Sequence, residues 1–399
     1  MSMRLGLREW GAAELGAGLG AIFGPSRHAA REAALADWFG RQFGAAALPL
    51  NSGSSALQLA LECLAARAPQ RREVLLPALA CPALTRVLQR CGLEPRYTDI
   101  GPDLNTPMQA LAEAIGTRTL AVIMVHAYGH PADAPAIQAL CRAQGVALLD
   151  DAAQRIDPAA GPGRFGDFAV FSFAQSKNVV SGVDGSGGLL LVHAREHLPA
   201  VEARWRQLTE APRRRSAWLE FTLQPHLPTA AYHLGRWRQR GRAKGQGPGL
   251  HRIAGIDAAL ALAQLASLEP RRRRRLALLH AWRMALDAAG IEAPQLRPGQ
   301  DDYLARLMVR LPAARRQACR DALAALGIAT RLPYPLPAAL PPGACPQARR
   351  LAAELLELPL PGRWQAADID AAAQSLARFG AGTEPTTQEG AMACNITGN

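Results

Sequence analysis

Short apolar runs alternate with helical patterns through the first 200 residues of the chain. Residues 120–125 are continuously apolar, and residues 74–76 and 146–149 form shorter runs of the same kind. Residues 54–66 and 134–144 have the leucine and alanine spacing of helices. Strands that alternate with helices are typical of parallel sheets, so we expect an α/β fold with a mostly parallel central sheet and flanking helices.

Polar side chains follow two of the predicted strands. Asp150 and Asp151 come directly after residues 146–149, and the largely apolar segment 168–173 runs toward Lys177. Parallel α/β sheets bind their ligands at the carboxyl ends of the strands. We therefore expect a functional site at this edge.

The pattern changes after residue 200. Residues 201–249 are rich in tryptophan and arginine and end in a Gly/Arg-rich stretch, which is typical of an insertion or linker. Residues 256–289 have a helical pattern. We expect a break or kink at Pro270, because proline disrupts the hydrogen bonds of a helix interior.

A smaller C-terminal α/β domain is predicted after this long helix. Residues 304–311 have the pattern of a strand, and residues 315–326 and 368–379 have the pattern of helices. The polar end of the chain predicts a disordered tail. We divide the chain into a large domain of residues 1–200, an insertion of residues 201–249, a small domain of residues 250–380 and a tail of residues 381–399.

The composition is that of a folded protein. Of the 399 residues, 49% are hydrophobic and 20% are charged, which excludes a wholly disordered chain. No apolar run approaches the ~18 residues of a membrane span, and the charges near the N-terminus argue against a secretory signal. The seven cysteines form no C-x-x-C pair, which argues against a disulfide framework and a zinc ribbon. We expect a cytoplasmic location.

Two pairs of histidines are spaced four residues apart: His126 with His130, and His193 with His197. Neither pair has a third metal ligand at a suggestive spacing in the sequence. No metal site is therefore predicted.

Arginine accounts for nearly all of the positive side chains behind the formal net charge of +12. We interpret this bias as a genome-wide preference and a solvated surface, and expect no nucleic-acid partner. The aromatic and basic residues of 204–246 leave two interpretations open. They could make a peripheral contact with the inner membrane surface, or they could form a lid or an oligomer contact.

Only Lys177 and Lys244 are lysines among the 45 cationic residues. An arginine side chain stays protonated, whereas a lysine amine can lose its proton and attack a carbonyl carbon. Lys244 lies in the Gly/Arg-rich stretch and is interpreted as incidental. Lys177 follows a predicted strand, and we expect it to carry chemistry; the alternative is a solvated surface lysine.

A candidate phosphate site precedes the first predicted helix, in Asn51-Ser-Gly-Ser-Ser. Gly53 allows a tight turn, and the hydroxyls and free amides of Ser54 and Ser55 are expected to face outward at the positive helix end. An ordinary serine N-cap would have the same sequence.

A second motif, Asp150-Asp-Ala-Ala-Gln154, places a carboxylate and an amide at a strand end. The carboxylate could hold a protonated ring nitrogen and the amide a phenolic oxygen, although an ordinary loop acid would look alike. Ser172 and Lys177 follow at the end of the next predicted strand. A phosphate cradle, a ring-nitrogen carboxylate and a Schiff-base lysine, in this order, are what pyridoxal phosphate needs.

These segments resemble the DegT/StrS-type sugar aminotransferases, which are pyridoxal-phosphate enzymes of fold type I. The resemblance covers residues 10–200 and 250–380 approximately. It is carried most specifically by Asp150-Asp-Ala-Ala-Gln154 and by Ser172-Phe-Ala-Gln-Ser-Lys-Asn178.

The resemblance implies a role for each residue of the two specific segments. Lys177 would form the Schiff base with the cofactor and transfer the catalytic proton. Asp151 would bind the pyridine nitrogen, and Gln154 would lie beside the ring hydroxyl. The family also contains sugar dehydratases with histidine in place of this lysine, so Lys177 favours transamination.

Four further positions are matched to the cofactor by the same resemblance. Ser54, Ser55 and Ser172 would bind its phosphate. Cys81 lies near the position where the family has an aromatic residue stacked on the cofactor ring.

The implied reaction moves an amino group from an amino acid, with glutamate the expected donor, to a keto sugar that is nucleotide-linked in the family. Polysaccharide biosynthesis and a homodimer with shared active sites follow from the same resemblance. Departures at Cys81, at residues 250–253 and near Tyr334 leave an alternative open. The protein could bind pyridoxal phosphate with altered or lost transaminase activity, or act at a membrane surface on a different keto compound.

Overall fold

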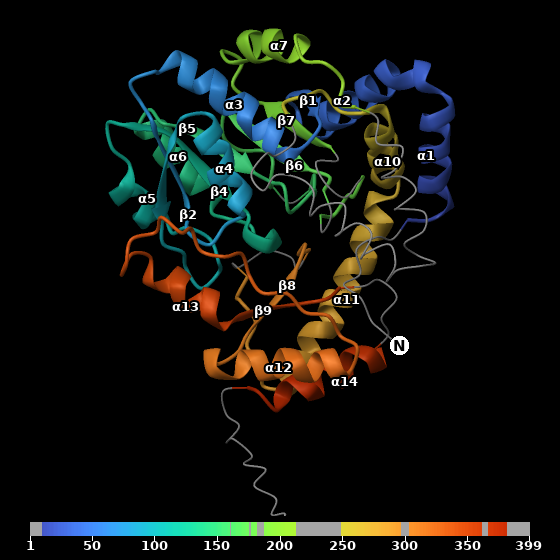
Figure 1. Ribbon diagram of the computed structural model, residues 1–399, viewed down its shortest axis with the longest axis vertical. Helices are drawn as coiled ribbons and strands as arrows, with labels where there is room; N and C mark the ends of the chain where they lie inside the picture. Colours follow the sequence, from blue (N-terminus) through green and yellow to red (C-terminus); the bar gives the residue numbers. More distant parts are fainter. Residues whose placement is uncertain are drawn as a thin grey trace, which may run out of the picture.

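The computed structural model describes residues 10–159, 161–174, 177–181, 187–212, 249–296, 303–360 and 366–380. Two sheets organise these residues into a large unit and a small unit, which lie one above the other in Figure 1. Among the described residues, no helix is both long enough and apolar enough to span a lipid bilayer.

The large sheet confirms the predicted architecture. Its strand order is β1-β7-β6-β5-β4-β2-β3, and neighbouring strands are parallel except at β7, which is antiparallel to β1 and β6. The strands are β1 (Ala46–Leu50), β2 (Glu73–Pro77), β3 (Glu94–Thr98), β4 (Thr119–Val125), β5 (Ala147–Asp151), β6 (Phe168–Ser172) and β7 (Gly188–Val192). Strands β4 to β7 are almost entirely buried, which explains their continuous apolar runs.

The edge strand β3 was not predicted from the sequence. Its residues alternate between exposed side chains, such as Glu94, and more buried ones. A strand at the edge of a sheet tolerates such polar residues, so it lacks the apolar run that marks the central strands.

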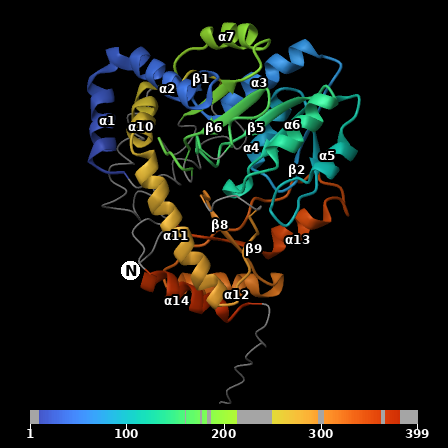
Figure 2. The same cartoon turned by 180° about the vertical axis from the view of Figure 1, so that it is seen from behind.

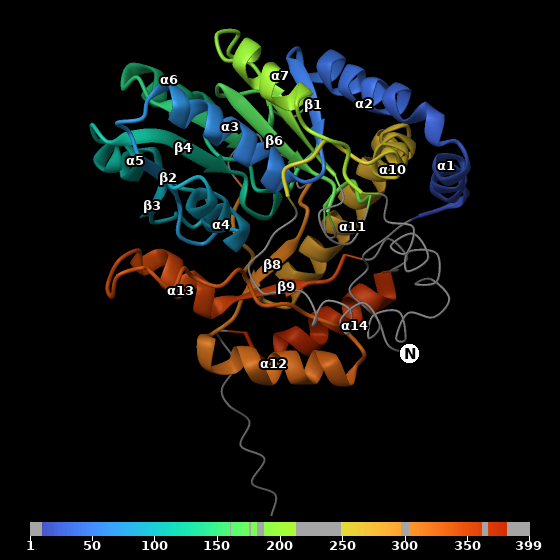
Figure 3. The same ribbon diagram turned by 45° about the horizontal axis from the view of Figure 1, so that its top comes forward.

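Helices cover both faces of the large sheet (Figure 3). On one face α3, α4 and α7 share an apolar core with the strands. On the other face α2 and α10 pack against β6 and β7, and α5 and α6 pack against β2, β4 and β5. These helices are α2 (His28–Phe43), α3 (Gly53–Arg67), α4 (Pro82–Arg90), α5 (Met108–Ala114), α6 (Ala134–Ala143), α7 (Leu198–Arg206) and α10 (Gly255–Leu265), with α1 (Ala12–Phe23) packed on α10.

The predicted smaller C-terminal α/β unit is present. Its antiparallel strands β8 (Leu307–Arg310) and β9 (Leu355–Leu358) share a core with α11, α12 and α14 around the buried Trp282. The helices are α11 (Leu268–Ala288), α12 (Ala313–Ala325), α13 (Pro346–Glu354) and α14 (Ala366–Ala377). Figure 2 shows α11 running from α10 into the small unit.

The prediction of a break at Pro270 is wrong in position. The helix is interrupted at Ala266 and Ser267, between α10 and α11. Pro270 lies in the first turn of α11, where backbone N–H groups have no acceptor within the helix, so proline removes no hydrogen bond.

The predicted strand of residues 304–311 is shortened to β8. The backbone N–H groups of Ala305 and Arg306 donate to the carbonyl oxygen of Tyr128, at 3.1 and 3.2 Å, instead of to a strand. A contact between the two units therefore replaces the start of the expected strand.

The predicted domain boundary at residue 200 falls inside α7. Trp205, on this helix, donates its indole N–H to the carbonyl of Pro49 at 2.9 Å, and the guanidinium of Arg252 lies 4.5 Å from its ring centre. Trp205 therefore packs within the large unit. Residues 213–248 of the insertion and the tail 381–399 lie outside the described residues.

Two residues of the arginine run 271–275 reach the large unit, whereas Arg273 and Arg274 are exposed. Arg271 pairs with Glu14, and Arg272 lies 3.2 Å from the buried carboxylate of Asp157. Helix periodicity points successive arginines to different sides of α11, so part of the run faces the large unit and part faces solvent.

Candidate active site

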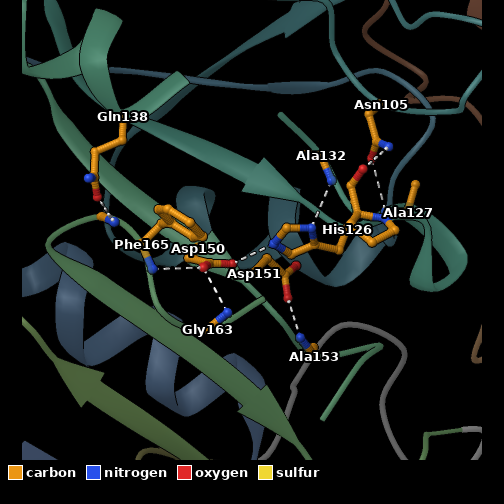
Figure 4. A network of polar contacts seen from close by, with 12 residues as sticks. Asn105, His126, Ala127, Ala132, Gln138, Asp150, Asp151, Ala153, Gly163 and Phe165 are labelled. Atoms are coloured by element: carbon orange, nitrogen blue, oxygen red, sulfur yellow. Dashed lines mark hydrogen bonds and ion pairs between the residues drawn. The ribbon is translucent and has the colours of Figure 1, made fainter. Parts of the chain in front are cut away.

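Asp150 and Asp151 are the last two residues of β5, at the carboxyl edge of the large sheet. Consecutive residues of a strand point to opposite faces, so the two carboxylates enter different surroundings. Asp150 is 0% exposed and Asp151 is 9% exposed. Figure 4 shows both side chains with their hydrogen-bond partners.

Asp150 uses both of its carboxylate oxygens within the protein. Oδ1 accepts a hydrogen bond from Nε2 of His126 at 2.8 Å, and Oδ2 accepts from the backbone N–H groups of Gly163 and Phe165 at 2.8 and 3.3 Å. Nδ1 of His126 accepts from the N–H of Ala132 at 2.9 Å, which places the imidazole proton on Nε2. Asp150 therefore has a structural role: both of its oxygens are hydrogen-bonded within the protein, and it orients His126.

Asp151 is much less engaged. Its Oδ1 accepts from the N–H of Ala153 at 3.1 Å. Burial raises the pKa of Asp151, whereas the positive charge of Lys177 opposes that increase. Of the two neighbouring carboxylates, Asp151 is the one available to a cationic group of a ligand.

Lys177 lies in the segment that follows β6, and it is half-buried. Burial lowers the pKa of Lys177, Cys81 and Asp151 oppose this decrease, and the guanidinium of Arg306 lowers the pKa further. The structure thus brings Lys177, Asp151 and Cys81 into one electrostatic environment. A lowered pKa increases the neutral amine, which is the form that attacks carbonyl carbons and accepts protons.

Gln154 presents a buried polar atom that lacks a partner. Its side chain is 4% exposed, and its Oε1 has no hydrogen-bond donor among the described residues. A buried acceptor left unpaired costs about 1–3 kcal/mol. A ligand hydroxyl would satisfy this oxygen, which fits the ring hydroxyl of pyridoxal phosphate.

The start of α3 packs tightly against the ends of β6 and β7. A Cβ atom at Gly53 would lie 2.9 Å from Cβ of Ser172, and one at Gly188 would lie 2.3 Å from the nitrogen of Gly53. Both glycines are therefore required for the close approach. The first-turn N–H groups and the Ser172 hydroxyl lie together, as a phosphate site would need.

The expectation that Ser55 offers a free amide is wrong. Ser52 is the N-cap of α3: its Oγ accepts from the N–H of Ser55 at 3.0 Å and lies 2.9 Å from the Ser55 hydroxyl. Ser55 is only 1% exposed. Ser54 is half-buried, and as a first-turn residue its N–H has no acceptor within the helix.

Tyr128 of the large unit meets Tyr334 and Arg306 of the small unit, residues for which the sequence analysis assigned no role. Tyr128 has a left-handed backbone (φ 56°), and its hydroxyl accepts from the N–H of Tyr334 at 3.0 Å. The two rings stack with centres 5.3 Å apart. The guanidinium of Arg306 lies 5.1 Å from the Tyr334 ring centre and pairs with Glu357 at 3.0 Å. Arg306 gave no local signal, because it falls within a run that has the pattern of a strand.

Asn51 fixes the returning end of the insertion beside α3. Its backbone N–H donates to the carbonyl of His251 at 3.1 Å, its Oδ1 accepts from the N–H of His251 at 3.1 Å, and its Nδ2 donates to Gly249 at 2.8 Å. The segment of residues 250–253, in which the chain departs from the family, therefore lies next to the candidate phosphate site.

The two pairs of histidines spaced four residues apart do not form metal sites with each other. His126 bonds to Asp150, and His193 lies 3.0 Å from the carbonyl of Gly163. His197 instead shares a group with Asp167 and Glu196, whose ligand atoms all lie within 4.8 Å of one another. Sequence spacing could not reveal this group, because strand pairing and the turn before α7 bring its members together.

Comparisons with known proteins agree with the resemblance drawn from the motifs. The model of the DegT/DnrJ/EryC1/StrS aminotransferase family matches residues 21–377. A UDP-N-acetyl-3-dehydro-alpha-D-glucosamine 3-aminotransferase from Acidithiobacillus ferrooxidans is 29% identical, with 77% of each chain covered. A dTDP-3-amino-3,4,6-trideoxy-alpha-D-glucose transaminase from Streptomyces venezuelae is 30% identical over 79% of this chain and 77% of its own.

Solved structures agree on the fold. The aminotransferase TlmJ from Streptoalloteichus hindustanus superposes with a TM-score of 0.74 at 24% identity, covering 94% of this chain and 98% of its own. DesV from S. venezuelae, in complex with a ketimine intermediate, gives a TM-score of 0.69 at 25% identity, with 92% and 94% covered. The predicted fold type is confirmed.

Proposed function

Because the chain belongs to the DegT/DnrJ/EryC1/StrS aminotransferase family, we propose that it transfers an amino group from an amino acid to a keto sugar, with pyridoxal phosphate bound at the carboxyl edge of the large sheet. Membership of an aminotransferase family supports the reaction class. The name of one relative contains a UDP-linked 3-dehydro sugar and the name of another a dTDP-linked amino sugar, which supports a nucleotide-linked acceptor.

The residues proposed to hold the cofactor fit its separate parts. Asp151 would face the ring nitrogen, Oε1 of Gln154 would accept from the ring hydroxyl, and Ser54 and Ser172 would bind the phosphate at the start of α3. Ser55, whose amide and hydroxyl are engaged by Ser52, would support this turn rather than donate its amide. When bound, pyridoxal phosphate supplies an aldehyde that condenses with amines and a ring that accepts electrons.

Proton transfer falls to Nζ of Lys177. Its lowered pKa means that more of the amine is neutral at physiological pH than for an exposed lysine, so it can accept a proton from the substrate carbon and return it. Asp151 would remain ionised once a protonated ring nitrogen lies against it, because an opposite charge offsets the effect of burial.

The proposal is supported most directly by two observations: Lys177 and Asp151 each influence the pKa of the other, and Gln154, three residues after Asp151, has a buried Oε1 without a donor among the described residues. The test is reduction of the cofactor-loaded protein with borohydride, followed by peptide mass spectrometry. We expect the cofactor mass on Lys177 in the wild type and on no peptide of Lys177→Arg. Lys244, the other lysine, serves as the internal control, and modification there alone would refute the proposal.

Spectral change in two steps tests the reaction. Glutamate should remove the visible absorption of the bound cofactor, and a nucleotide-linked keto sugar should restore it. Binding of the cofactor without either change would favour the alternative, a protein with altered or lost transaminase activity.

A cytoplasmic homodimer is part of the same proposal and is supported by the family resemblance. Light scattering of the purified protein should give twice the mass of the 42.5 kDa chain. Peripheral membrane contact through residues 204–246 is a separate proposal. This proposal predicts that the protein co-sediments with anionic vesicles. Trp205 packs within the large unit, and the other aromatic residues of 204–246 lie outside the described residues.

A further inference from the structure

Asp167, Glu196 and His197 form a cluster that the proposed chemistry above does not use. Each side chain contributes one potential ligand atom, a carboxylate oxygen of each acid and a ring nitrogen of the histidine. These three atoms all lie within 4.8 Å of one another. The sequence spacing did not single out this cluster, because Asp167 lies far from the other two residues along the chain.

The cluster lies at the amino edge of the parallel strands, opposite the edge that carries Asp151. Asp167 directly precedes β6, and Glu196 and His197 follow β7, whose last residue pairs with the first residue of β6. Asp151 ends β5, which runs parallel to β6. In Figures 1 and 2, α7, which begins directly after His197, lies on the side of the large unit away from the small unit. A ligand of this cluster would therefore lie apart from the candidate active site.

The imidazole of His197 is held in place by packing. The residue is only 9% exposed, and its ring stacks on the buried Phe168 with ring centres 5.1 Å apart. Its Nδ1 is buried and has no hydrogen-bond partner among the described residues. A buried polar atom without a partner costs free energy unless a ligand satisfies it. The fold thus orients this histidine and leaves it open to a ligand.

The two carboxylates also keep oxygens for a ligand. Oδ2 of Asp167 accepts a hydrogen bond from the N–H of Leu148 at 2.7 Å, which orients the side chain and leaves Oδ1 for a further partner. The side chain of Glu196 is exposed and can rotate, while Arg67 donates to the backbone carbonyl of Glu196 at 2.8 Å. The positive charge of Arg67 opposes a bound cation, but the two carboxylates together carry one charge more.

We propose that Asp167, Glu196 and His197 bind Zn²⁺ or a similar divalent transition-metal ion, which ties the start of α7 to the amino edge of the large sheet. The proposal does not depend on the transaminase function. An imidazole combined with carboxylates favours zinc over Mg²⁺ and Ca²⁺, which prefer oxygen ligands. Two ligand atoms on one tetrahedral zinc lie roughly 3.4 Å apart, so modest side-chain rotations close the cluster on the ion. Water supplies the fourth ligand from the exposed side of Glu196.

The test is a calorimetric titration of the full-length protein with ZnCl₂, after dialysis against a chelator, and a parallel titration with MgCl₂. The variants are His197→Gln, Asp167→Asn and Glu196→Gln, and the control is His193→Gln. Nε2 of His193 lies 3.0 Å from the carbonyl of Gly163, so the control removes an imidazole from the same segment outside the cluster. The chain also has seven cysteines that can bind zinc. The difference between variants is therefore the decisive quantity.

We expect the same zinc affinity in the wild type and in His193→Gln. Loss of an outer partner of a metal ligand lowers metal affinity by about 10- to 100-fold, so loss of His197 or Asp167 as a direct ligand should lower it by ~100-fold or more. Glu196→Gln should cost only ~10-fold, because water can replace an exposed ligand. Zinc should raise the melting temperature of the wild type more than that of His197→Gln, because a ligand of the folded state stabilises it.

A wild-type protein that binds no zinc, or that binds it no more tightly than His197→Gln, would overturn the proposal. Magnesium binding that depends on the two acids but not on His197 would show an ordinary acidic surface and would overturn it as well. If His197→Gln or Asp167→Asn fails to fold, Glu196→Gln decides, because an exposed side chain can be replaced without disturbing the core. Unchanged zinc affinity in Glu196→Gln would then overturn the proposal.

Discussion

Asp150 and Asp151 are neighbours on one strand, yet their carboxylates differ in how many hydrogen bonds they accept from the protein. Asp150 accepts three hydrogen bonds from the protein and orients His126. Asp151 accepts one, from Ala153, and its pKa is raised by burial. A saturated buried carboxylate stabilises the fold, whereas an undersaturated one is costly unless a ligand completes it.

The comparison extends to the surrounding residues. Asn51, His126 and Ser52 have their polar atoms engaged within the chain and form the rigid frame of the site. Gln154 keeps an unpaired buried atom. A preorganised binding site is expected to have this arrangement, in which polar groups with unused hydrogen-bonding capacity are held in place by fully hydrogen-bonded neighbours.

Asp151→Asn should give the largest effect. Loss of the charge facing the cofactor ring is expected to lower the transamination rate by about a hundredfold or more. Stability should stay equal or rise, because burial raises the pKa of Asp151 and the folded state disfavours its charge at neutral pH. Rates and urea unfolding measured on the same preparation check both parts, and a large loss of stability would contradict the open character of this site.

Asp150→Asn is the matched control and should do the reverse. The new amide group would face N–H donors, so we expect the free energy of unfolding to fall by about 2–4 kcal/mol. The rate per folded molecule should change little by comparison with Asp151→Asn. If Asp150→Asn instead kept its stability and lost its activity, the roles assigned to the two aspartates would be exchanged.

His130 tests whether a buried histidine next to the sheet edge must stay uncharged. Burial, with the charges of Arg283 and Arg155, lowers the pKa of His130 to about 3. In the unfolded chain this histidine has a pKa near the usual ~6.5. Between pH ~6.5 and pH about 3 the unfolded state therefore binds more protons than the folded state. The folded protein is fully stabilised above this range, and it loses that stability as the pH falls through it. Relative to His130→Gln, the wild type should lose about 1.4 kcal/mol per pH unit below pH ~6.5. Urea midpoints at three pH values measure this slope, and parallel curves for the two proteins would exclude it.

Gln154→Met should give the smallest effect. Replacing a buried amide whose oxygen is unpaired by an apolar side chain of similar length is expected to leave the cofactor-free protein as stable, or more stable by about 1 kcal/mol. Cofactor affinity should fall by about 5- to 10-fold. Thermal unfolding without cofactor and a cofactor titration separate the two effects, and lower stability without cofactor would mean that Gln154 already has a partner.

Local patterns predicted much of the fold and the correct family. The central strands β4 to β7 are buried on both faces, so their apolar runs mark them in the sequence. The edge strand β3 lacks this signal. The predicted position of the break at Pro270 was wrong, because the sequence pattern alone did not show that this proline lies in the first turn of a new helix.

The candidate site was predicted in part for similar reasons. Lys177, Asp151 and Gln154 lie in motifs that resemble a family, and their roles remain predictions. The choice between Ser52 and Ser55 as the cap of α3 depended on backbone geometry that adjacent serines do not reveal. Arg306 and Tyr334 reach the site from the small unit, and no short motif connects them to Lys177.

The sequence by itself determined the alternation of strands and helices, the family and the residues able to perform the chemistry, because these depend on side-chain type and on spacing along the chain. Only the tertiary structure decided which of two adjacent aspartates is saturated, which serine caps α3 and which arginine lowers the pKa of the lysine. Those outcomes depend on hydrogen-bond partners and burial supplied by segments that are distant in sequence and meet only when the chain folds.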